Sequence, residues 1–201
     1  MSVTSTATTR RTIQLPIDDG VVGLRGLSPQ RLRFELEYAL ERGSTANSVL
    51  FAAGDGAPAV LVHPPGAAYS VAFLPVLAEA LPSSDAQLLV VVGHVNPNRV
   101  ALLRDLAETY TDLELIVSNP GAKLIEELWS QRKPAPPGEK NEQPPLPDLP
   151  PLRVIRQEQS LPLSHQRSLM LLPAPTPRWP GGLLAFEESL GLLMSDKFFS
   201  A

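Results

Sequence analysis

The stretch that decides the fold is residues 88–104, LLVVVGHVNPNRVALLR. It predicts a buried strand over residues 88–92, a turn over residues 93–98 and a helix that begins at Arg99. The strand is apolar at every position, which is typical of a strand covered on both faces in an α/β fold. Polar side chains that follow such a strand lie at the sheet edge where ligands bind.

The turn carries four polar residues in the pattern His94-x-Asn96-x-Asn98-Arg99. A dinuclear metal site in this frame would need His-x-Glu-x-Asp-His, because hard cations take carboxylate oxygens and imidazole nitrogens. Here each acid is replaced by its amide, and the second histidine is replaced by an arginine. The turn therefore keeps the frame of a metal site without most of its ligands.

The composition is that of one sizeable domain. The chain has 201 residues, 43% of them hydrophobic, with a net charge of −4 and no cysteine. An acidic balance without a basic stripe argues against nucleic acid or an anionic membrane as partner. The lack of cysteine excludes disulfides and thiolate metal sites. Because neither a secretory signal nor an apolar run long enough to span a bilayer is present, we expect a cytoplasmic protein.

The pattern along the chain changes near residue 69. Before that point, alternation and turn residues predict an antiparallel meander with strands over residues 12–17, 21–24, 33–39, 48–52 and 59–62. After it, helices over residues 71–81 and 99–110 alternate with strands over residues 88–92 and 113–117. A third helix is expected to have Asn119 as its cap and Pro120 at its first position. Further short strands are predicted over residues 152–155, 168–172, 182–186 and 192–194.

Two segments fall outside this pattern. Residues 1–11 read as a disordered tail, so that a single domain is expected over residues 12–201. In residues 131–151, eight of the 21 residues are proline, which excludes a helix or a strand ladder and predicts an exposed loop. A ligand for a proline-recognising partner is the alternative interpretation of this loop, although no basic PxxP motif favours it.

Four local strings carry a resemblance to a known family. They are ERGSTANS at residues 41–48, VGHVNPNR at 92–99, APTPRWP at 174–180 and MSDKFF at 194–199. Together with the order of elements, they resemble the metallo-β-lactamase-like domain of flavodiiron proteins, specifically the cyanobacterial diflavin type. The resemblance implies an α/β (α+β) fold, an αββα metallo-β-lactamase-like sandwich. We expect mainly its N-terminal part, and therefore an incomplete, truncated sandwich.

The resemblance places six residues at the positions of the family's iron ligands: His94, Asn96, Asn98, Arg99, Arg178 and Asp196. Only His94 and Asp196 keep a ligand side chain, as the first histidine and the bridging carboxylate. The family implies di-iron and FMN, but we expect neither in this chain. We expect Arg99 or Arg178 to pair with Asp196 and to take the electrostatic place of the metal, because an arginine stays protonated in proteins.

Structural interpretations of the same residues stay open beside these. Asn96 and Asn98 precede a helix, where asparagine is a common cap. His63 and His165 are expected to be structural or surface residues. Trp179 is expected to pack over the former metal site.

The resemblance implies part of a flavodiiron NAD(P)H:oxygen oxidoreductase, a photoprotective electron sink that reduces oxygen to water. With its di-iron ligands mostly lost, this chain alone is expected to be inactive. The alternative is a catalytically silent subunit in a homo- or heterodimer with an intact flavodiiron paralogue, since in this family one chain's flavin serves the other's iron. A metal-dependent hydrolase of the same superfold is a weaker alternative, because activating water needs the missing ligands.

Overall fold

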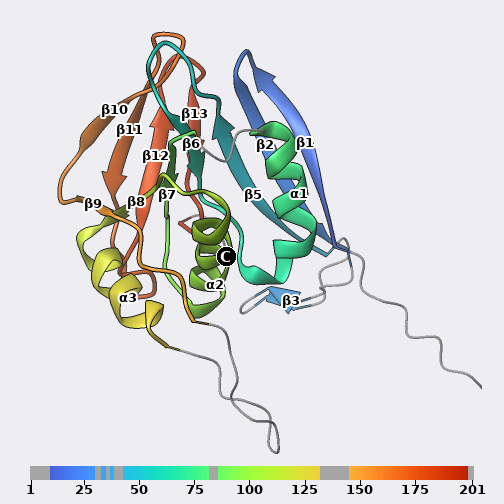
Figure 1. Cartoon of the computed structure of the whole chain (residues 1–201), viewed down its shortest axis with the longest axis vertical. Coiled ribbons are helices and arrows are strands. Elements are labelled where there is room, and N and C mark those ends of the chain that lie inside the picture. Colours follow the sequence, from blue (N-terminus) through green and yellow to red (C-terminus); the bar gives the residue numbers. More distant parts are fainter. Residues whose placement is uncertain are drawn as a thin grey trace, which may run out of the picture.

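The computed structural model describes residues 10–29, 43–81, 86–131 and 145–198, together with the backbone of residues 33–34 and 37–38. Two β-sheets stack on each other, and helices cover the outer face of the larger sheet (Figure 1). The larger sheet has the strand order β1-β2-β5-β6-β7-β8-β9, and the smaller has the order β10-β11-β12-β13. This arrangement confirms the expected metallo-β-lactamase-like sandwich for the part of the chain that the structure describes.

The larger sheet comprises β1 (Arg11–Asp18), β2 (Val21–Ser28), β5 (Ser44–Phe51), β6 (Ala59–Val62), β7 (Leu88–Val91), β8 (Leu113–Ser118) and β9 (Leu152–Ile155). The smaller sheet comprises β10 (Gln159–Pro162), β11 (Ser168–Pro173), β12 (Leu183–Glu187) and β13 (Leu192–Met194). The helices are η1 (Ala67–Tyr69), α1 (Ser70–Ala80), α2 (Pro97–Thr109) and α3 (Asn119–Trp129).

The larger sheet changes from antiparallel to parallel at β6. Strands β1, β2, β5 and β6 pair antiparallel, as the predicted meander requires. Strands β6, β7, β8 and β9 pair parallel, and α1, α2 and α3 connect them in turn. The carboxyl ends of β6, β7 and β8 therefore meet at one edge of the sheet, where the turn after β7 lies.

The uninterrupted apolar character of β7 follows from its place between two hydrophobic cores. Leu88 and Val90 point into the core under the helices, whereas Leu89 and Val91 point into the core between the two sheets. All four are at most 1% exposed. Because successive side chains of a strand point to opposite faces, a strand that is covered on both faces must be apolar throughout.

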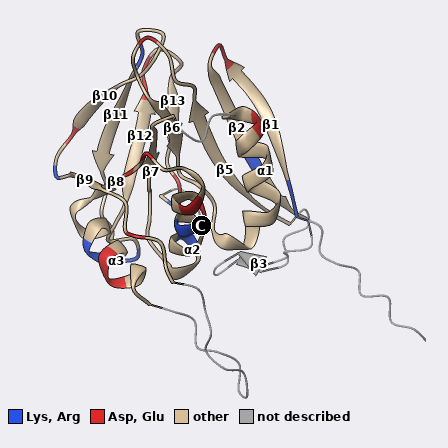
Figure 2. Cartoon of the chain, viewed as in Figure 1, with Lys and Arg blue, Asp and Glu red and all other residues tan. Residues whose placement is uncertain are grey.

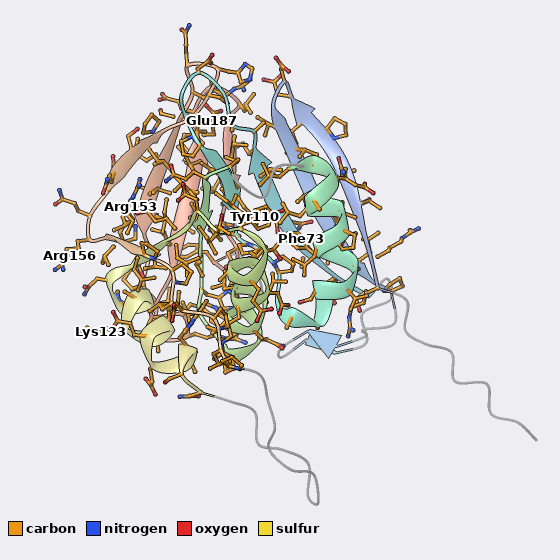
Figure 3. The ribbon with its side chains drawn as sticks, viewed as in Figure 1. Phe73, Tyr110, Lys123, Arg153, Arg156 and Glu187 are labelled. Atoms are coloured by element: carbon orange, nitrogen blue, oxygen red, sulfur yellow. The ribbon has the colours of Figure 1, made fainter. Side chains whose placement is uncertain are left out.

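The strands at the centre of the larger sheet carry no charge. Figure 2 shows the charged segments on the helices and near strand ends, while β6 and β7 contain no charged residue. In Figure 3, Phe73 points from α1 toward the sheet, whereas Lys123 and Arg156 point away from the molecule. Phe73 is fully buried, in keeping with its role in the core under the helices.

Three sequence-based predictions of local structure need correction. The stretch 33–39 is not one strand, because its described backbone forms β3 (Arg33–Phe34) and β4 (Glu37–Tyr38), which pair antiparallel with each other. The cap of α3 is Ser118 rather than Asn119, since the Ser118 hydroxyl accepts from the Gly121 N–H at 3.2 Å. Strand β10 was not predicted, and Leu161 is the one residue of it that is buried.

The predicted tail and proline-rich loop lie largely outside the described residues, which begin at Arg10 and omit 132–144. Strand β1 begins at Arg11, one residue before the predicted strand over residues 12–17. At the end of the proline-rich segment, Pro150 is buried. That end of the segment packs against the protein.

Candidate functional site

The turn after β7 and the end of β13 build one hydrogen-bonded cluster, although they are about a hundred residues apart in the chain. It consists of His94, Asn96 and Arg99 from the turn and the start of α2, and Asp196 after β13. We call these four residues the site network. The side chains of Arg99 and Asp196 are 7% and 10% exposed, so their charges are largely removed from water.

Arg99 and Asp196 form the centre of the site network. The Arg99 guanidinium donates from Nη1 to Asp196 Oδ2 at 2.5 Å and from Nη2 to Asp196 Oδ1 at 3.2 Å. This two-point geometry is the one in which arginine binds carboxylates most strongly. The expected arginine–aspartate pair is thus confirmed, and the arginine is Arg99.

Asn96 is fixed by the start of α2. Its Oδ1 accepts from the Arg99 backbone N–H at 2.8 Å, which satisfies one of the free donors of the helix N-terminus. The amide nitrogen must then face the other way, and it lies 2.9 Å from His94 Nε2. Asn96 is therefore the predicted cap, whereas Asn98 lies inside α2 and its prediction as a cap is wrong.

This orientation of Asn96 assigns the proton on His94. Because the Asn96 amide N–H donates to Nε2, that nitrogen must be unprotonated, and the ring proton sits on Nδ1. Nδ1 then donates to Asp196 Oδ2 at 2.8 Å. Burial lowers the pKa of His94, which agrees with a neutral ring in this position.

The charges within the site network cancel one another. Burial alone would raise the pKa of Asp196, but the Arg99 charge and the His94 hydrogen bond hold it well below its usual range. Asp196 is therefore ionised and balances the fixed charge of Arg99. With His94 uncharged, no net charge remains in the network.

His63, which the sequence predicted only as a structural or surface residue, is a buried member of the site. It follows β6 directly, is 3% exposed, and donates from Nε2 to the Leu183 carbonyl oxygen at 3.0 Å. Burial lowers the pKa of His63 to about 4, so the ring is neutral. The parallel pairing of β6 with β7 was the available signal, since it places the residue after β6 beside the turn at Gly93.

Gly93 allows this close packing. A Cβ atom at Gly93 would lie 2.4 Å from Asp196 Oδ2 and 2.8 Å from His63 Cδ2. Asp196 and His63 both have positive φ, 47° and 55°, which non-glycine residues adopt only when their surroundings hold them. Close packing therefore holds the backbone of the site in one conformation.

A cavity of about 700 Å³ lies over the site network. Its lining includes five of the six predicted positions: His94, Asn96, Asn98, Arg99 and Asp196. Arg178, the sixth, lies beside the cluster, with its guanidinium 5.3 Å from the centre of the Trp179 ring. Trp179 meets the His94 ring edge-on at 4.9 Å, which confirms that it packs over this site.

The donor set of the site does not fit a di-iron centre. Both oxygens of Asp196 are bonded to Arg99, and the free nitrogen of His94 accepts from Asn96. Asn96, Asn98 and Arg99 offer no carboxylate or imidazole. In the part of the chain that the structure describes, no three histidine, aspartate or glutamate side chains are grouped to hold a metal.

Comparisons with known proteins give the family. Diflavin flavoprotein A 6 of Nostoc sp. is 35% identical over 187 residues, which is 93% of this chain and 29% of that protein. The Flv1 flavodiiron core from Synechocystis sp., in a metal-soaked crystal structure, matches with a TM-score of 0.76 and 32% identity, over 96% of this chain and 43% of that one. Fragment 1–254 of diflavin flavoprotein A 5 from Nostoc sp. matches with a TM-score of 0.79 and 30% identity, over 96% of this chain and 69% of that one.

The chain belongs to the flavodiiron protein family, and it corresponds to the metallo-β-lactamase-like core. It spans about 30% of the length of the curated relatives it matches, 29% and 31% for two of them. No family model matches the chain. Among the described residues, no helix has the length and apolar content needed to cross a membrane.

Proposed function

We propose that this chain is the core domain of a cytoplasmic flavodiiron oxygen reductase in which the site network has replaced the di-iron centre. In this proposal it works as a catalytically silent subunit beside a paralogue with intact ligands. The observation that carries the proposal is the Arg99–Asp196 pair, which uses both oxygens of the one remaining carboxylate.

Charge supports this interpretation at the six positions that we match to the family's iron ligands. A di-iron(II) centre brings four positive charges, and the matched positions supply only Asp196 to balance them. Arg99 would repel an incoming ion by about 4 kcal/mol per unit of charge at a separation of about 4 Å and an effective dielectric constant of about 20. Metal binding would therefore require Arg99 to leave a buried, hydrogen-bonded position.

The oxygen chemistry of the assembly then belongs to the intact paralogue. Reduction of oxygen to water, with electrons from NAD(P)H through FMN, would take place at the paralogue's di-iron centre. This chain would have a structural role in the dimer and no catalytic one. Its own site would be held in shape by the guanidinium instead of by metal.

Metal content tests the first half of the proposal. Protein from iron-supplemented cells is analysed for iron and zinc, and we expect close to none in the wild type. The triple variant Asn96→Glu/Asn98→Asp/Arg99→His returns ligand side chains and is expected to bind divalent metal measurably in calorimetric titration. Asn98→Asp alone is the matched control and should bind none. Near-stoichiometric iron in the wild type would overturn the proposal.

Co-expression with an intact diflavin paralogue tests the second half. We expect a mixed complex on affinity purification, with oxygen consumption that is abolished by replacing iron ligands in the paralogue. Asn98→Ala in this chain should leave the rate unchanged. Failure to form a mixed complex, or a rate that depends on Asn98, would refute the partner role.

A further inference from the structure

We draw no further inference here: the strongest candidate, the cavity of about 700 Å³ over the site network with Arg25 and Lys197 in its lining, belongs to the site already described.

Discussion

Replacing Arg99 by methionine tests directly whether its guanidinium holds the site network together. Methionine keeps much of the length of the side chain but removes the charge and all hydrogen bonds to Asp196. Asp196 then remains 10% exposed with only His94 as partner. Breaking a buried ion pair on one side costs about 3–5 kcal/mol. Removing a cation from the first turn of α2 returns about 0.3–1 kcal/mol, so we expect a net loss of stability of about 2–5 kcal/mol at pH 7.

The pH dependence gives this prediction a second, independent signature. In the wild type the pKa of Asp196 lies well below its usual range, mainly because Arg99 outweighs the effect of burial. That stabilisation is present above the unfolded-state pKa, near 4, and is lost as the pH falls through the folded-state pKa. Without Arg99, burial acts with less opposition and the pKa of Asp196 rises. The stability difference between the two proteins should therefore shrink as the pH is lowered from 7 toward 4.

Urea unfolding followed by circular dichroism measures both effects. The matched control is the double variant Arg99→Met/Asp196→Leu, which removes both charges together. Replacing a whole buried pair by apolar side chains is often close to neutral, so we expect this variant to lie within about 1 kcal/mol of the wild type. A cost of less than about 1 kcal/mol for Arg99→Met at pH 7, or a double variant as unstable as the single one, would refute this role of Arg99.

Three further predictions concern the neighbours of this pair. The wild type should lose on the order of 3 kcal/mol of stability between pH 7 and pH 4 through His63, because its pKa in the folded protein is about 4 and the unfolded chain is protonated first. His63→Gln should lack this loss, and equal pH dependence of the two proteins in urea unfolding would contradict the prediction. Asn96→Asp keeps the cap on α2 but replaces an N–H donor by a charged acceptor beside His94 Nε2, so the pKa of His94 should rise in an NMR titration. Asn96→Ser also caps and removes the donor without adding a charge, so it should raise the pKa of His94 less; an equal rise in both variants would contradict this. Gly93→Ala should cost about 1–3 kcal/mol in thermal unfolding, since its Cβ would meet Asp196 Oδ2 at 2.4 Å, while Gly56→Ala, with no atom within 4 Å of its Cβ, meets no such contact and reports only the strain of its positive φ.

Strands and helices with a strong periodic pattern were predictable from the sequence. The bounds of β6, β9 and β13 agree with the predicted ranges, and α2 and β7 differ from theirs by two residues or fewer. In these elements, local hydrophobic pattern and tertiary burial demand the same residues. The predictions failed at 33–39, where the described backbone forms the two short strands β3 and β4, and at β10, where a single buried residue gives no alternating pattern.

The cap of α3 was predicted one residue away from its observed position. Ser118 and Asn119 are both good capping residues and adjacent in sequence, so propensity does not choose between them. Only the structure shows that the Ser118 hydroxyl reaches the Gly121 N–H and the Gly181 carbonyl. The bond to Gly181, in the turn before β12, joins Ser118 to a segment 63 residues away, which local sequence does not encode.

In the candidate site, too, the sequence determined some features and only the tertiary structure decided others. The sequence by itself determined which residue types stand at the six positions that we match to the family's iron ligands: one histidine, one aspartate, two asparagines and two arginines. Which arginine pairs with Asp196 was decided by tertiary structure, because the partners are 97 residues apart and both sheets must form before they meet. The same holds for the proton on His94 and for the membership of His63, since hydrogen-bond direction and the meeting of strand ends exist only in three dimensions.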